Sequence, residues 1–163
     1  MMIDTENRRT EATPTYPESS DERKHTMTAA RFPDTAPGRV LLATALRWHV
    51  DSLAASRAHT RAAATELGLE PRTQRACALA ASELVSNALE HGSPPLELRL
   101  LEIASGLRLE VEDASPKPPT ELHVPATAAS GRGLSIVGAV STRWGHYSTG
   151  SGKCVWCDIV ASD

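Results

Sequence analysis

The period at which apolar residues recur changes abruptly at residues 92–95, and this change most constrains the fold. Before it, residues 71–91 show a helical pattern that begins at Pro71, a residue suited to the first turn of a helix. Gly92 and the two prolines at 94–95 end that pattern, because proline cannot continue a helix. The chain therefore predicts a long helix that stops at Gly92.

Two segments after this point, 96–103 and 107–113, alternate apolar and polar residues as half-buried strands do. Ser105 and Gly106 form the predicted turn between them. The second strand has one apolar face, and Asp113 ends that face. Because a buried carboxylate needs hydrogen-bond donors, Asp113 is either a turn residue or the acceptor for a ligand's amino group, such as that of adenine.

The remaining segments complete an α+β pattern. Residues 38–67 have helix-like apolar spacing, and 114–130 read as a loop rich in proline, alanine and serine. Residues 131–140 open with glycines and continue as a helix, whereas 142–149 and 153–160 read as a closing pair of strands. Antiparallel hairpins with helices grouped apart predict a two-layer α/β sandwich, with a mixed, mostly antiparallel sheet covered on one face by helices.

The chain of 163 residues is long enough for one domain with a hydrophobic core. Residues 1–30 are polar, carry scattered charges and contain few apolar groups, so we expect a disordered tail there. Met27, within this tail, is an alternative start of the protein. The ordered domain is expected over residues 31–161.

Charge and cysteine usage narrow the class of protein. The net charge is −3 and aromatic residues make up 4%, which gives no basis for binding nucleic acid or an anionic membrane. No apolar run approaches the roughly 20 residues that span a bilayer, and no secretory signal is visible. Three cysteines, an odd and sparse number, fit a reducing cytoplasm. Cys154 and Cys157 form a C-x-x-C in a predicted strand, where residues three apart face opposite sides, so a metal or redox role is disfavoured.

One stripe of the predicted second helix combines small and polar residues. Glu83 and Asn87 project about 40° apart, Ala76 and Ala80 precede them, and His91 follows one turn later. The small side chains predict room for a ligand against the helix. The polar side chains are either a solvated face near a helix end or a site, in which the amide oxygen suits Mg²⁺ and the carboxylate suits a general base.

Glycines precede the third predicted helix, in the segment Ser130, Gly131, Arg132 and Gly133. Such a turn lets backbone N–H groups at a helix N-terminus approach phosphates, although a plain loop-to-helix turn has the same pattern. The segment is neither a P-loop nor a dinucleotide-binding fingerprint, because the required spacing is absent.

Together, "ELVSNALEHG", "VEDASPKPP", "GRGLSIVGAVSTRWG" and "GKCVWCDI", in this order, resemble the ATP-binding domain of the GHKL superfamily. More narrowly, they are similar to the anti-sigma-factor serine kinases and related short histidine-kinase-like ATPases. The resemblance covers roughly residues 31–160 and implies a Bergerat-type sandwich that binds Mg-ATP.

The resemblance also implies roles for individual residues. The first motif, the N box, makes Glu83 the general base and Asn87 the Mg²⁺ ligand, with His91 beside the phosphates. The second motif, the G1 box, makes Asp113 the partner of the adenine amino group. Two further positions of that motif, normally glycine, are occupied by other residues expected to contact ATP: Ser115 and Lys117. In the third motif, the G2 box, the expected ATP-binding residues are Gly131, Arg132, Gly133 and Leu134.

The implied function is transfer of the γ-phosphate of ATP to a serine or threonine of a STAS-type anti-anti-sigma protein, with a sigma factor as a second partner. Related kinases commonly form homodimers. Because the G1 box lacks glycines that allow close backbone contact with the nucleotide, two alternatives remain open. One is a nucleotide-dependent binding module without turnover, which sequesters a transcription regulator. The other is an α+β interaction protein with degenerate motifs.

Overall fold

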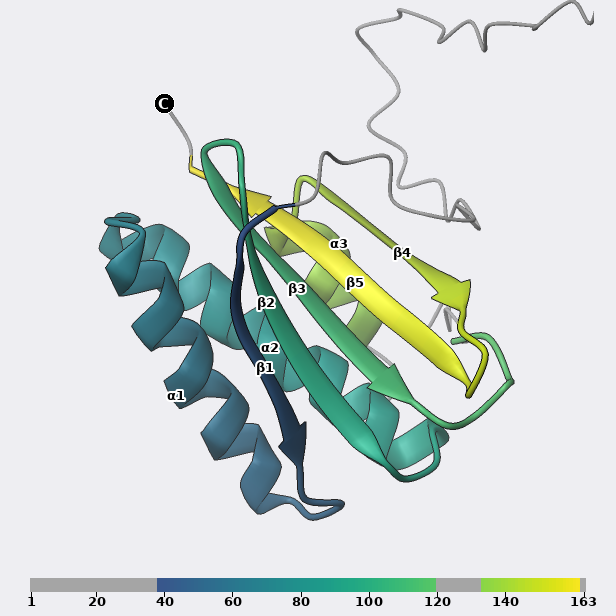
Figure 1. Cartoon of the computed structure of the whole chain (residues 1–163). Coiled ribbons are helices and arrows are strands. Elements are labelled where there is room, and N and C mark those ends of the chain that lie inside the picture. Colours follow the sequence, from purple (N-terminus) through teal and green to yellow (C-terminus); the bar gives the residue numbers. More distant parts are fainter. Residues whose placement is uncertain (1–37, 120–132, 162–163) are drawn as a thin grey trace, which may run out of the picture.

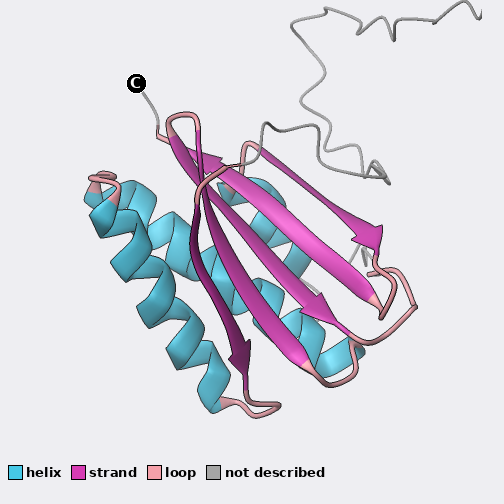
Figure 2. Cartoon of the chain, in the orientation of Figure 1, coloured by secondary structure: helices cyan, strands magenta, loops and turns pink. Residues whose placement is uncertain are grey.

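A computed structural model describes residues 38–119 and 133–161, which form a five-stranded sheet and three helices (Figures 1 and 2). The strands are β1 (Val40–Leu46), β2 (Leu96–Ile103), β3 (Gly106–Asp113), β4 (Arg143–Ser148) and β5 (Lys153–Val160). The helices are α1 (Asp51–Glu66), α2 (Pro71–His91) and α3 (Gly133–Val140). The predicted α+β sandwich is therefore confirmed. No helix within these residues is both long and apolar enough to cross a bilayer.

The sheet has the strand order β1-β2-β3-β5-β4, and each pair of neighbours is antiparallel. All three helices cover the same face, which makes two layers (Figure 1). Helix α2 packs beside both α1 and α3 and crosses β3 and β5. The last turn of α2 thereby comes to the end of the sheet where β3 stops.

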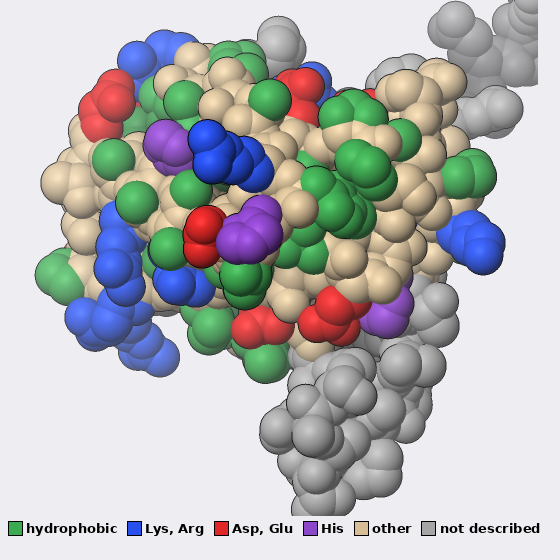
Figure 3. Space-filling model, turned by 90° about the horizontal axis from the view of Figure 1, so that it is seen from below, with side chains coloured by type: hydrophobic (Ala, Val, Ile, Leu, Met, Phe, Trp, Pro, Cys, Tyr) green, Lys and Arg blue, Asp and Glu red, His purple; other side chains and the backbone are tan. Residues whose placement is uncertain are grey.

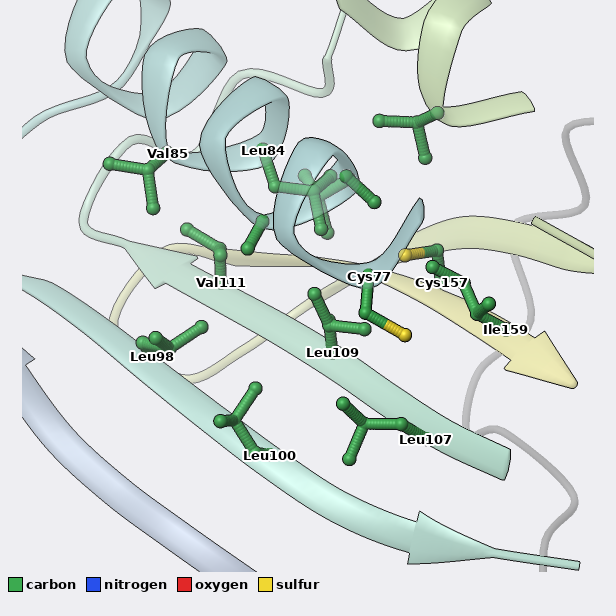
Figure 4. Close-up of a cluster of buried hydrophobic side chains, with 14 of the residues drawn as sticks. Cys77, Leu84, Val85, Leu98, Leu100, Leu107, Leu109, Val111, Cys157 and Ile159 are labelled. Carbon is green, nitrogen blue, oxygen red and sulfur yellow. The ribbon is translucent and has the colours of Figure 1, made fainter. Parts of the chain in front are cut away.

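The core lies between the sheet and the helices (Figure 4). The alternation that predicted one apolar face of β3 is confirmed, because Leu107, Leu109 and Val111 are at most 1% exposed. Leu84 of α2 and Ile159 of β5 pack into the same cluster. Burial of each such side chain contributes about 1.5–3 kcal/mol to folding, so this face sets the position of α2 on the sheet.

The helix predicted over residues 38–67 is wrong in its first part, where β1 occupies Val40–Leu46. The apolar spacing fits a strand equally well: alternate residues Leu42, Thr44 and Leu46 are half-buried, the two leucines pack against the core, and the intervening Ala43 and Ala45 are exposed. Backbone pairing with β2 decides in favour of the strand. Helix α1 then begins at Asp51, an acidic residue that suits the positive end of the helix dipole.

The opposite face of the sheet carries buried charges that the sequence did not predict. Arg108 donates to both carboxylate oxygens of Asp158, at 2.6 and 2.9 Å, directly across the β3–β5 pair. Arg143 also contacts Asp158, at 2.7 Å, and Arg108 lies 4.5 Å from the ring centre of Trp156. Strand β3 is thus buried on both faces.

Several predictions fall outside the described residues. These are the tail over 1–30 with Met27, most of the loop over 114–130, and Gly131 and Arg132 of the glycine segment. The described part of that segment begins at Gly133, the first residue of α3.

Candidate functional site

The second half of α2 carries the predicted polar stripe. Glu83 and Asn87 are half-buried, whereas His91 in the last turn is exposed and its Nε2 lies 3.7 Å from Oε2 of Glu90. The stripe therefore leads from a partly enclosed carboxylate to the surface.

The alanines of this stripe do not provide the predicted space for a ligand. Ala80 is fully buried in the core cluster, and Ala76 packs against that cluster. Protein therefore occupies this side of the helix. Any ligand against α2 must lie beyond these alanines, from Glu83 onward.

Glu83 faces the start of α3. A Cβ atom added to Gly133 would lie 3.1 Å from Oε2 of Glu83 and 3.8 Å from its backbone oxygen. The structure thus brings the predicted general base next to the described end of the glycine segment, although the two are far apart in the sequence.

Burial raises the pKa of the Glu83 carboxyl group, and the negative charge of Glu90 raises it further. A higher pKa means that the carboxylate has a greater affinity for a proton. The electrostatic environment of Glu83 therefore suits a group that accepts a proton from a hydroxyl or from water.

Asp113 is only 2% exposed at the end of β3. Its Oδ1 accepts hydrogen bonds from the backbone N–H groups of Ser93, at 3.2 Å, and Ser115, at 2.8 Å. A Cβ atom added to Gly92 would lie 2.6 Å from Cγ of Asp113, so only glycine lets the end of α2 approach the carboxylate this closely. The N box and the G1 box therefore meet at Asp113.

Lys153, which the sequence reading missed as a site residue, lies opposite Asp113 in the β3–β5 ladder. Its Nζ is 3.0 Å from Oδ1 and 2.8 Å from Oδ2 of Asp113. Both side chains are buried, with 3% of Lys153 and 1% of Asp113 exposed. The only sequence signal was a lysine after the Gly152 turn, and the strand register alone places it beside the carboxylate.

His146 adds no second positive charge near this pair. Burial lowers the pKa of the imidazole, and the charge of Lys153 lowers it further. Because the ordinary value is 6.5, His146 is neutral at pH 7. Among the described residues, Lys153 is the basic residue in contact with the carboxylate of Asp113.

Ser115 and Lys117, which occupy glycine positions of the G1 box, build a turn after β3. Ser115 is buried; its N–H donates to Asp113, and its Oγ accepts the N–H of Lys117 at 3.3 Å. Lys117 is exposed. The serine stabilises the turn through its side chain, whereas the lysine is free to reach toward solvent.

Leu134 differs from its neighbours in the expected phosphate site. Its side chain is 4% exposed and belongs to the core cluster. Leu134 can contact a phosphate only through its backbone, near the N-terminus of α3.

Asn87 fits a Mg²⁺ site in which the ion is bound jointly by the protein and by the phosphates of a nucleotide. Mg²⁺ takes oxygen ligands and is often held by one or two protein groups together with phosphates and water. The described residues contain no cluster of three or more His, Cys, Asp or Glu placed to hold a metal ion by themselves. A single amide oxygen one turn from Glu83 suits an ion that phosphates also bind.

The C-x-x-C pair lies on two faces of β5. Cys157 is in the core cluster under the helices, and Cys154 is in the alternate position of the same strand. Burial raises the pKa of both thiols, that of Cys154 to about 12. Both are therefore protonated at neutral pH.

Helix α2 links the two groups of site residues. Between Glu83, which faces α3, and Gly92, which contacts Asp113, the helix rises about 13 Å. Figure 3 views the molecule from below; basic side chains cluster at one side of this face, and basic, acidic and histidine side chains also lie near its middle. This face therefore carries both signs of charge.

The two-layer fold and these two groups of residues fit an ATP-binding α/β sandwich domain. The family model of the histidine kinase-like ATPase domain matches residues 46–159, and the chain belongs to this family. An uncharacterized protein of Streptomyces coelicolor is 34% identical over 82 residues, which cover 47% of this chain and 78% of that protein. The predicted resemblance is confirmed at the level of the family.

Proposed function

We propose that this chain is a Mg-ATP-dependent protein kinase that transfers the γ-phosphate to a serine or threonine of a STAS-type anti-anti-sigma protein. The observation that carries the proposal is the separation along α2 of Glu83 at α3 from the buried Asp113. The rise of about 13 Å between these ends is comparable to the length of a nucleoside triphosphate. The adenine ring would lie at Asp113, and the phosphates would lie at Gly133.

In this reaction the substrate hydroxyl attacks the γ-phosphorus, the bond to the β–γ bridging oxygen breaks, and ADP leaves. Glu83 would take the hydroxyl proton, and Asn87 would hold a Mg²⁺ ion, which would supply positive charge to neutralise the phosphates. Backbone N–H groups at the start of α3, with Arg132, stabilise charge that develops on the transferred group. The half-burial of Glu83 and its raised pKa support the role of base.

A second candidate is a module that binds nucleotide without turnover and thereby changes its affinity for a sigma factor or another transcription regulator. The observation that favours it is the G1 turn. Ser115 is buried and bonded to Asp113 where a glycine would allow the backbone to approach the nucleotide closely.

The test is transfer of label from γ-labelled Mg-ATP to the STAS proteins encoded in the same genome. Wild type is expected to label a serine or threonine of one of them, and Glu83→Ala is expected to abolish transfer while retaining nucleotide binding. Asn87→Ala is expected to lose the Mg²⁺ dependence. Glu70→Gln is the matched control, because Glu70 is exposed at the other end of the same helix and is expected to change nothing.

The outcomes separate the candidates. Nucleotide binding without transfer to any STAS protein, together with nucleotide-dependent binding of a sigma factor, supports the binding module. The absence of a rise in melting temperature at millimolar Mg-ATP would contradict both candidates. The remaining hypothesis would then be an α+β interaction protein that binds no nucleotide. Sedimentation of the chain with and without ATP tests the homodimer that related kinases form.

A further inference from the structure

The ammonium group of Lys153 has more donors than its surroundings use. An ammonium carries three N–H donors and no acceptor. Within the described residues, the two oxygens of Asp113 are the acceptors that lie within hydrogen-bond distance of Nζ. These two contacts leave one of the three N–H donors of Nζ without a partner among the described residues. A buried donor without a partner is costly, so this position favours a further acceptor.

The two carboxylate oxygens of Asp113 have different numbers of hydrogen-bonding partners. Its Oδ1 accepts from three groups: the N–H of Ser93, the N–H of Ser115 and Nζ of Lys153. Its Oδ2 contacts Nζ of Lys153 alone among the described residues. Oδ2 therefore has acceptor capacity left, and it lies 2.8 Å from the ammonium nitrogen that carries the unused donor.

We propose that Lys153 is a base-reading residue: its ammonium donates to N1 of adenine while Oδ2 of Asp113 accepts from the adenine amino group. This inference rests on the proposed binding of ATP. Adenine presents a donor, the amino group, next to an acceptor, N1. The Asp113–Lys153 pair presents the complementary acceptor and donor side by side on neighbouring strands.

The pairing makes Lys153 different from a purely structural partner of Asp113. A structural lysine would stabilise the fold whatever base is bound. A base-reading lysine couples to one atom of the ligand, so removing that atom and removing the lysine should not have additive effects.

The test is a thermodynamic cycle that combines a change of Lys153 with a change of the N1 atom of the ligand. Equilibrium binding of Mg-ATP and of Mg-1-deaza-ATP, in which a C–H replaces N1, is measured on the full chain and on Lys153→Met. Wild type is expected to bind 1-deaza-ATP about ten-fold or more weakly than ATP, the size of a charged hydrogen bond. Lys153→Met is expected to bind the two nucleotides equally. Mg-7-deaza-ATP, altered at another ring position, controls for changes in stacking.

Arg108→Met is the matched control variant. Arg108 and Asp158 form another buried, directly opposed ion pair of β3 and β5, but on the face of the sheet away from the helices. Its loss perturbs the same strands, and the preference for ATP over 1-deaza-ATP is expected to persist. If Lys153→Met does not fold, Lys153→Arg keeps the charge and the donors and is expected to keep the preference.

Equal binding of ATP and 1-deaza-ATP by wild type would overturn the inference and leave the proposed function standing. Tighter binding of both nucleotides by Lys153→Met would also overturn it, because Lys153 would then block Asp113 rather than read the base. If wild type binds no adenine nucleotide, the proposed function fails as well.

Discussion

The contact between Gly92 and Asp113 makes Gly92→Ala the most informative change to the fold. The added Cβ would lie 2.6 Å from Cγ and 2.8 Å from Oδ1 of Asp113, and it would overlap the carbonyl oxygen of Ala88. Favourable carbon–carbon separations are about 3.5–4.0 Å. The carboxylate or the end of α2 must therefore move by about 1 Å.

Neither group can move cheaply. The Asp113 carboxylate is held by Ser93, Ser115 and Lys153. Overpacking alone costs about 1–3 kcal/mol. Loosening the buried pair with Lys153 adds up to about 3 kcal/mol, because breaking such a pair leaves a charge without its partner. We expect Gly92→Ala to lower the free energy of unfolding by about 3–5 kcal/mol.

The assay is thermal unfolding followed by circular dichroism, with urea denaturation as a second measurement. For a domain of this size, 1 kcal/mol corresponds to about 3–5 °C in Tm, so the expected fall is about 10–20 °C. Gly150→Ala is the control, because a Cβ there would meet nothing within 4 Å and its Tm should stay within about 2 °C of wild type. A Gly92→Ala protein as stable as this control would refute the reasoning.

Three further predictions follow from named contacts. Burial raises the folded-state pKa of Glu83 above its ordinary 4.5, so ionisation of Glu83 lowers stability as pH rises through that pKa. Glu83→Gln should therefore have a higher Tm than wild type at pH 7, and the difference should vanish well below pH 4.5, as a pH series of melting curves can show. Gly133→Ala should keep its Tm within about 3 °C, because the flexible Glu83 side chain can move by a few tenths of an ångström at the 3.1 Å contact. The rate of phosphate transfer by this variant should nevertheless fall. An unchanged rate would count against the catalytic role of Glu83. Arg108→Met leaves Asp158 buried with Arg143 as its remaining charged partner, so urea denaturation should show a loss of about 2–4 kcal/mol, and a loss below 1 kcal/mol would indicate that the pair contributes little.

The elements with strong local signals were predictable from the sequence. Pro71 and Gly92 mark the ends of α2, and the alternation of β3 predicted its buried face. Strand β1 was not predictable in the same way, because its apolar spacing fits either a helix or a strand. Its state is decided by hydrogen bonds to β2, which lies some 50 residues further along the chain.

The candidate site likewise has features that the sequence predicts and features that it does not. Glu83, Asn87 and Asp113 were identifiable from the sequence because each is a polar residue at a position where the local period favours an apolar one. The space predicted beside Ala80 was wrong, because Ala80 is buried in the core cluster and no local pattern records what covers a given face of a helix.

By itself the sequence determined the helices and strands with regular periods, the α+β class, and the polar residues that break those periods, because these depend on neighbours within a few residues. Only the tertiary structure decided that Gly133 lies against Glu83 and that Lys153 faces Asp113. Those contacts depend on helix packing and on strand register. A shift of one residue in β5 would turn Lys153 to the other face of the sheet.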